Sequence, residues 1–277
     1  MAKNLIATAI ISVLSMSCFY SVAEANNSPT LMPIDNPIVL QRADPWLVRD
    51  EKTGCYTFIG TSPKFDEIEL RQACRLNDLK LAEPKVIWHK NEKGPMSTNI
   101  WAPELHKVDG SWYIHFAAGD VEKPFSIRMY VLKNDSENPM NGQWQEMGQL
   151  KTHLDSFSLD ATTFSHKGKR YLVYNSALWI AQMDSPTSIK EPIVNISEPT
   201  LDWEIQGYKV NEGAAVMIRE GKVLLTYSAS ATDDRYAMGL LWADADADLL
   251  DPASWHKKPQ PIFASNEKVG RFGPGHN

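Results

Sequence analysis

The sequence Trp101-Ala102-Pro103-Glu104-Leu105 is followed, after a short turn, by Gly110-Ser111-Trp112-Tyr113-Ile114-His115-Phe116. A carboxylate stands near the start of the first run, a glycine marks the turn, and aromatic and β-branched residues fill the second run. These residue types are typical of strands, and a glycine between two such runs favours a tight connection. The stretch therefore predicts a β-hairpin.

The same plan occurs four times along the chain. Its turn glycines stand at residues 54, 110, 168 and 221, and so recur at intervals of 56, 58 and 53 residues. A unit of this length accommodates about four short strands, which is one blade of a β-propeller. Strong helical periodicity is absent. We therefore predict an all-β, five-bladed β-propeller, truncated early in its fifth blade. Its blades are expected at about 40–95, 96–152, 153–205 and 206–265, with the start of the fifth at 270–277.

Length and composition fit one such domain. The chain has 277 residues, of which 43% are hydrophobic, and a net charge of −6. No basic stripe or polybasic arm is present, which argues against a nucleic-acid partner. Nine Trp, nine Tyr and nine Phe are present, and these rings either stack on sugars or fill the β core.

The first 25 residues are predicted to be a signal peptide, which leaves residues 26–277 as a single catalytic domain. Lys3 precedes an apolar run, and Ala23-Glu24-Ala25 resembles a cleavage site. We expect a secreted or periplasmic protein with no membrane span, and lipid anchoring through Cys18 is the alternative. Cys55 and Cys74 then remain, and the sequence leaves open whether they pair.

Carboxylates recur at the start of the first run in each unit. They are Asp44, Glu104, Asp160 and Glu212. If the units circle an axis, the starts of their first strands converge, and these side chains share one central pocket. Glu104 is interpreted as structural, bonding across blades.

Each carboxylate also has a plainer interpretation. Asp44 precedes a proline and fits a turn, Asp160 could bond nearby amides, and Glu212 beside a glycine could lie in an exposed turn. Taken together they fit glycosidic hydrolysis, which needs one carboxylic acid to protonate the leaving oxygen and a second carboxylate to activate water. A third carboxylate would hold the acid and raise its pKa.

These residues resemble glycoside hydrolase family 43, and most closely its exo-acting α-1,5-L-arabinofuranosidase branch. The resemblance covers Asn36 to Asn277. The motifs that carry it are Arg42-Ala43-Asp44-Pro45, Trp101-Ala102-Pro103-Glu104-Leu105-His106, Ser158-Leu159-Asp160-Ala161-Thr162, Val210-Asn211-Glu212-Gly213 and Gly273-Pro274-Gly275-His276-Asn277.

The resemblance implies an inverting hydrolase that releases terminal α-L-arabinofuranosyl units from arabinan or arabinose-substituted plant polysaccharide. Asp44 would be the general base, Glu212 the general acid, and Asp160 the residue that orients Glu212. It also implies a base–acid separation of about 6.5–9.5 Å. His276 would lie beneath the active site, near a structural calcium or sodium ion, and no organic cofactor is expected. Trp101, Asn175 and Ser228 are further candidates for substrate binding.

Three departures from the family pattern stand out. Ala214 replaces a usual proline, the stretch 174–179 is shorter than its counterparts, and the fifth blade is incomplete. A β-xylosidase or endo-arabinanase on the same fold remains an alternative, as does an inactive truncated carbohydrate-binding propeller. The protein is expected to be a monomer.

Overall fold

The computed structural model describes residues 33–154 and 157–276. The predicted signal peptide, including Cys18, lies outside these residues. In the described part of the chain no helix is both long and apolar enough to cross a bilayer.

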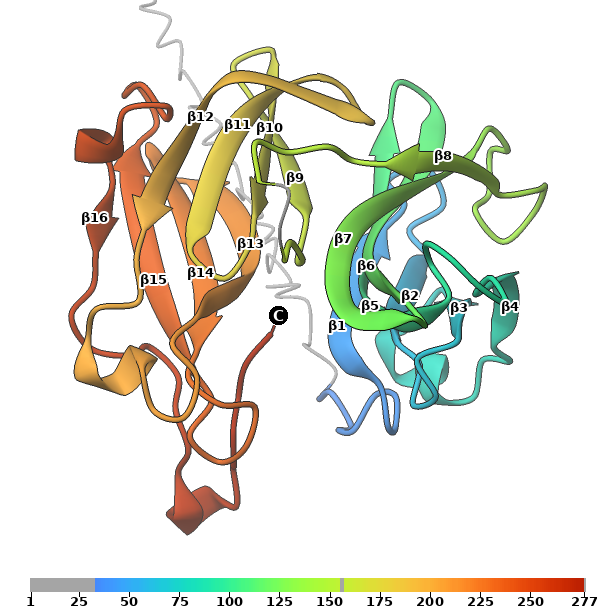
Figure 1. Cartoon of the computed structure of the whole chain (residues 1–277). Coiled ribbons are helices and arrows are strands. Elements are labelled where there is room, and N and C mark those ends of the chain that lie inside the picture. Colours follow the sequence, from blue (N-terminus) through green and yellow to red (C-terminus); the bar gives the residue numbers. More distant parts are fainter. Residues whose placement is uncertain (1–32, 155–156, 277) are drawn as a thin grey trace, which may run out of the picture. The chain divides into compact units, whose positions relative to one another are not determined.

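The described residues form an all-β propeller of four blades, each a four-stranded antiparallel sheet in sequential strand order (Figure 1). The first blade contains β1 (Ala43–Arg49), β2 (Tyr56–Thr61), β3 (Glu67–Ala73) and β4 (Lys85–His89). The second contains β5 (Thr98–Val108), β6 (Ser111–Asp120), β7 (Lys123–Asn134) and β8 (Gln145–Gln149). The third contains β9 (Thr162–His166), β10 (Lys169–Tyr174), β11 (Leu178–Ser185) and β12 (Ser188–Ser197). The fourth contains β13 (Asn211–Arg219), β14 (Lys222–Ala229), β15 (Ala237–Asp244) and β16 (His256–Lys257).

The five-blade prediction is met only in part. Four sheets are present in the described residues, and 270–276, expected to open a fifth blade, contributes no named strand there. One isolated bridge joins Asn266 to Arg271. The segment then runs inward, where His276 contacts Asp44 of β1.

The first hairpin of blades two, three and four closes through two residues, the second of which is a predicted turn glycine. The turn pairs are Asp109-Gly110, Lys167-Gly168 and Glu220-Gly221, and every φ in them is positive, between 49° and 87°. Two-residue turns with both φ values positive match the twist of the flanking strands, which explains why glycine recurs there. Blade one has a wider connection, because Arg49 pairs with Tyr56.

Apolar clusters join successive blades. Ile59 and Leu105 belong to the cluster between the first two blades, and Leu172 belongs to the next. A third cluster packs blade three against blade four through residues that include Ile180 and Leu225. All five side chains are fully buried, and each such side chain contributes about 1.5–3 kcal/mol on burial. This packing fixes the starting points of the first strand of each blade, here called the inner strands: β1, β5, β9 and β13.

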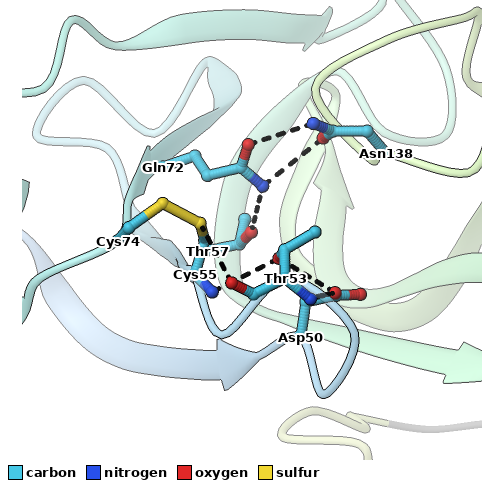
Figure 2. The surroundings of a disulfide bond; sticks show 7 residues. All are labelled: Asp50, Thr53, Cys55, Thr57, Gln72, Cys74 and Asn138. Carbon is cyan, nitrogen blue, oxygen red and sulfur yellow. Dashed lines mark hydrogen bonds between the residues drawn. A yellow bond between two sulfur atoms is a disulfide. The ribbon is translucent and has the colours of Figure 1, made fainter.

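A disulfide links Cys55, which precedes β2, to Cys74, which follows β3 (Figure 2). Nearby, Gln72 donates to Thr57 Oγ1 at 3.0 Å, and Asn138 of blade two donates to Gln72 Oε1 at 3.0 Å. The bond therefore closes the β2–β3 hairpin beside a contact between two blades.

Removing this disulfide is expected to cost stability but not activity. Its cysteines are 19 residues apart, and closing a loop of that size contributes about 3 kcal/mol by restricting the unfolded chain. The double variant Cys55→Ala/Cys74→Ala should lower the free energy of urea unfolding by about 2–4 kcal/mol. Neither cysteine lines the cavity described below, so turnover by the folded variant should be unchanged. An unchanged unfolding free energy would contradict the prediction.

Candidate active site

The inner strands border a cavity of about 870 Å³ at their starting ends. Asp44 of β1, Asp160 just before β9 and Glu212 of β13 all line it. Three carboxylates from three blades therefore share one cavity, as the repeat predicted. Trp101 of β5 and His276 line the same cavity.

A backbone feature recurs where the inner strands begin. Asp44, Ala102 and Asp160 have φ values of 52°, 45° and 54°, and Gly213 has 55°. Residues other than glycine rarely adopt positive φ, and such conformations often occur at functional sites. In blades one, two and four the strand pairing slips across this position, which marks a β-bulge.

The sequence suggested that the four carboxylates occupy equivalent positions of the repeat, and the positive-φ residue shows that they do not. Asp44 and Asp160 occupy the positive-φ position itself, whereas Glu212 stands one residue before it and Glu104 two residues after it. The four carboxylates are therefore not at equivalent positions of the repeat. The bulges of blades one and four redirect the neighbouring side chains, so that Asp44 and Glu212 reach the same cavity from different positions.

Asp44 is held by two donors. The Thr61 hydroxyl donates to Asp44 Oδ2, and Thr61 in turn accepts a hydrogen bond from the Ala102 N–H at 2.7 Å. Asp44 Oδ1 lies 3.1 Å from His276 Nδ1. Both contacts fix the orientation of the Asp44 side chain in the cavity.

Asp160 is tied to the backbone beside Glu212. Its Oδ2 accepts a hydrogen bond from the Gly213 N–H at 2.8 Å and lies 4.0 Å from His276 Nδ1. Burial, together with the charge of Asp44, raises the pKa of Asp160 to about 6, against the opposing effects of His276 and the Gly213 N–H. Asp160 thus fixes the strand position immediately after Glu212.

Glu212 is a cavity carboxyl group whose surroundings favour protonation near neutral pH. Burial and then the neighbouring charge of Asp160 raise the pKa of Glu212 to about 7. The Tyr236 hydroxyl donates to Glu212 Oε1 at 2.9 Å and works in the opposite direction. A carboxylic acid that is still protonated at neutral pH can donate its proton to a leaving group.

His276 lies on the cavity wall, facing the carboxylates. Burial alone would lower the pKa of His276, but the charges of Asp44 and Asp160, followed by Glu212, outweigh it and raise the pKa to about 9. The ring is therefore an imidazolium near neutral pH. Its backbone N–H donates to Ser228 Oγ at 2.7 Å, which fixes the ring's position.

The residues around His276 do not fit direct binding of a cation through Nδ1. That nitrogen lies 3.1 Å from Asp44 Oδ1 and 4.0 Å from Asp160 Oδ2, and so it is already engaged by carboxylates. Within 33–154 and 157–276, no group of three or more His, Cys, Asp or Glu side chains is arranged to hold a metal ion. The calcium or sodium ion near His276 stays a prediction, and no catalytic step is derived through it.

The remaining predicted residues divide into two groups. Trp101 lines the cavity, and its ring meets Phe65 edge-on at 6.2 Å. Asn175 and Ser228 are buried and are not among the residues that line this cavity, so their role in substrate binding stays a prediction. Ser228 instead holds the backbone of His276.

Glu104 is buried away from the cavity lining, in agreement with a structural role. It lies 3.0 Å from His106 Nε2 and bonds the Thr162 side chain of the next blade. Burial raises the pKa of Glu104 to about 8, so this carboxyl is largely protonated at neutral pH.

Two contributors to the site were missed from the sequence. Tyr236 precedes β15 and reaches Glu212, and Thr61 ends β2 and reaches Asp44. Neither stands in a repeated motif near a carboxylate, so no sequence signal marked them. Only the packing of β14 and β15 against β13 and of β2 against β1 brings them to the site.

Gly213 is expected to tolerate no side chain. Its φ of 55° disfavours other residues, and an added Cβ would lie 3.0 Å from both Cγ and Nδ1 of His276. Gly213→Ala should cost about 1–2 kcal/mol of unfolding free energy and, by displacing His276 and the strand beside Glu212, about 100-fold in kcat/KM. Gly221→Ala is the matched control, because its φ is 73° but no atom lies within 4 Å of the added Cβ. It should lower stability alone, and an equal loss of activity in both variants would contradict the steric argument.

A β-propeller that brings three differently held carboxylates from separate blades into one cavity is suited to cleaving glycosidic bonds. This architecture defines the class of protein as a glycoside hydrolase. The profile described as "Glycosyl hydrolases family 43" matches residues 34–277, and the chain belongs to this family.

Similarity to individual proteins supports the family assignment. The chain is 44% identical over 262 residues to an extracellular exo-α-(1→5)-L-arabinofuranosidase of Streptomyces chartreusis, covering 91% of this chain and 80% of the relative. It is 46% identical to a protein of the same description from Streptomyces avermitilis, covering 98% of this chain but 58% of that relative. The crystal structure of an α-L-arabinofuranosidase from Lactobacillus brevis superposes with a TM-score of 0.85 at 45% identity, covering 88% of this chain and 80% of that chain.

Proposed function

We propose that this protein releases terminal α-L-arabinofuranosyl residues from arabinan or arabinose-substituted plant polysaccharide by an inverting single displacement. The observation that carries the proposal is the pair of unlike carboxyl environments in one cavity. Glu212 is half-buried beside another carboxylate and has a pKa raised to about 7, whereas Asp44 accepts bonds from Thr61 and His276. The names of the Streptomyces and Lactobacillus relatives support the choice of sugar.

In the proposed reaction Asp44 removes a proton from water as the oxygen attacks the anomeric carbon. Glu212 donates its proton to the leaving oxygen as the glycosidic bond breaks. Asp160 positions Glu212 through the Gly213 N–H and disfavours its ionisation. His276 holds Asp44 in place. The expected separation of about 6.5–9.5 Å between base and acid leaves room for the water.

The direct test uses aryl glycosides. The protein should release p-nitrophenol from p-nitrophenyl α-L-arabinofuranoside and not from the β-xyloside, and NMR should show β-arabinofuranose as the first product. Release from the xyloside would favour a β-xylosidase. Cleavage within linear arabinan without early release of arabinose would favour an endo-arabinanase. Binding of arabinan with no hydrolysis, unaffected by Asp44→Asn, would favour a noncatalytic propeller.

The pH dependence of kcat/KM tests the role of Glu212. The acid must be protonated, so activity should fall as pH rises through about 7, the value to which the pKa of Glu212 is raised. The hydrogen bond from Tyr236 lowers that pKa, so Tyr236→Phe should raise it and move the alkaline limb to higher pH. Tyr56→Phe, at the start of β2 and outside the cavity lining, serves as the control. An alkaline limb at the same pH in Tyr236→Phe as in the unaltered protein would show that this hydrogen bond does not lower the pKa of Glu212.

We also propose that residues 270–277 open a fifth repeat of the propeller. The support is conformational: His276 has a φ of 53°, like Asp44, Ala102, Asp160 and Gly213 at the same phase of the four blades. The extracellular description of the Streptomyces relatives supports a secreted or periplasmic location for this protein. The monomeric state stays a prediction.

A further inference from the structure

Aromatic side chains gather at the mouth of the active-site cavity. Six Phe and Tyr side chains count among the exposed large hydrophobic residues of the described chain. Four of them, Phe65, Phe125, Phe157 and Tyr208, line this one cavity. The catalytic carboxylates line the same cavity and are half-buried or buried, so the more exposed rings form its outer part. An exposed cluster of this kind marks a binding surface.

Phe125 and Tyr208 are the most exposed members, with 75% and 60% of their surface open to solvent. They come from separate blades, since Phe125 lies in β7 and Tyr208 in the connection that precedes β13. Neither ring belongs to the apolar clusters that the described residues form. Burial in the core therefore gives no reason for an aromatic residue at either place.

The backbone under both rings is braced. Beside Phe125, the carbonyl of Pro124 accepts a hydrogen bond from Asn99 Nδ2 at 2.8 Å, and the Ser126 hydroxyl donates to the carbonyl of Lys123 at 2.7 Å. Beside Tyr208, an added Cβ at Gly207 would lie 2.8 Å from the Ala231 side chain, so this loop packs closely against its neighbour. Rings on a fixed backbone lose little freedom when a ligand binds.

The charges around the mouth favour a neutral ligand. Arg42 is the only Arg or Lys among the described lining residues, and its guanidinium is already paired with Glu69 at 2.9 Å. The imidazolium of His276 is paired with Asp44 deeper in the cavity. Both cationic groups of the described lining are thus engaged by carboxylates, which leaves neither for an anionic partner. The faces of aromatic rings suit the C–H faces of neutral sugars.

We propose that Phe125 and Tyr208 form a platform that binds the sugar residues on the leaving-group side of the scissile bond, which makes the enzyme selective for arabinose chains over isolated arabinosides. This inference rests on the proposed function. The terminal arabinose enters the cavity between the carboxylates, and the next sugars of the chain stack on the exposed rings.

The test compares a chain substrate with a ligand that fills only the inner cavity. Phe125→Ala and Tyr208→Ala should each lower kcat/KM for α-1,5-arabinotriose by about tenfold, mainly through KM. The inhibition constant of free L-arabinose, measured in the same variants, should stay within about twofold of the unaltered protein. Val121→Ala, in the same hairpin as Phe125, and Ile205→Ala, near Tyr208, are matched controls, because both side chains are exposed and outside the cavity lining. They should leave both constants unchanged.

An unchanged kcat/KM for arabinotriose in both aromatic variants would overturn the platform and leave the proposed function intact. An equal weakening of arabinotriose and free arabinose would also overturn it, because the rings would then act on the inner site. If the unaltered protein releases no arabinose from arabinotriose, the proposed function is wrong, and the assignment of arabinose chains as the ligand of the platform is wrong with it.

Discussion

Glu212→Gln should lower kcat/KM for arabino-oligosaccharides by about 10²- to 10⁴-fold, because a glutamine side chain has no proton to give to the leaving oxygen. The loss should depend on the leaving group. A sugar alkoxide is a poor leaving group, so its departure needs the proton, whereas p-nitrophenolate is stable enough to leave largely without protonation. The same variant should therefore lose much less activity on p-nitrophenyl α-L-arabinofuranoside.

The variant should fold normally. The amide oxygen of the introduced glutamine can still accept the hydrogen bond that the Tyr236 hydroxyl donates to Glu212 Oε1 in the unaltered protein. Desolvation and the charge of Asp160 already disfavour the ionised form of Glu212, so replacing this side chain by a neutral amide should not weaken the fold. Glu220→Gln, at the exposed turn between β13 and β14, is the control and should leave both substrates unaffected. Equal losses on the two substrates would show that Glu212 is not the proton donor.

The local features of this fold could be predicted from the sequence. Each blade begins with a hairpin. Adjacent residues such as Asp109-Gly110 indicate the turn, and aromatic and β-branched residues indicate the strands. Repetition of that plan was enough to predict that Asp44, Asp160 and Glu212 meet. Sequence order predicted that they stand near the starts of separate strands, and the packing of successive blades brings them into one cavity.

The details of the site depend on features that a residue pattern does not record. A β-bulge shifts Glu212 by one residue relative to Asp44, and the hydrophobic pattern of β13 gives no sign of it. Tyr236 bonds to Glu212 across 24 residues of sequence, a contact that exists only after β15 has paired with β14. Exposure is equally hidden, because the sequence left open whether a ring such as Phe125 fills the core or faces a ligand.

The difference between Asp160 and Glu104 has the same origin. Both are buried carboxyl groups near the start of an inner strand. Asp160 has positive φ and lines the cavity, whereas Glu104 lies two residues beyond the bulge and bonds His106 and Thr162 inside the protein. Local backbone conformation, rather than residue type, therefore decides which carboxyl group takes part in the site.

Asp44→Asn should abolish base catalysis while preserving the fold, with a loss of about 10²- to 10⁴-fold in kcat. Asparagine tolerates the φ of 52° at this position better than most residues, and its side chain can still bond Thr61 and His276. The amide has no basic oxygen to accept a proton from water. Because the charge of Asp44 also helps to raise the pKa of Glu212, the alkaline limb of the residual activity should move to lower pH.

A second variant at this position separates base catalysis from structural damage. Asp44→Gly keeps the positive φ without strain and opens space where the carboxylate stood. Azide should then restore part of the activity, because it attacks the anomeric carbon without needing a base, while Glu212 protonates the leaving oxygen. The product should be β-L-arabinofuranosyl azide, with the configuration inverted from the α-linked substrate. Azide should not rescue Asp160→Asn, because Asp160 acts on Glu212 rather than on the attacking water. Formation of the α-azide, or rescue of both variants alike, would contradict the assignment of Asp44 as the base.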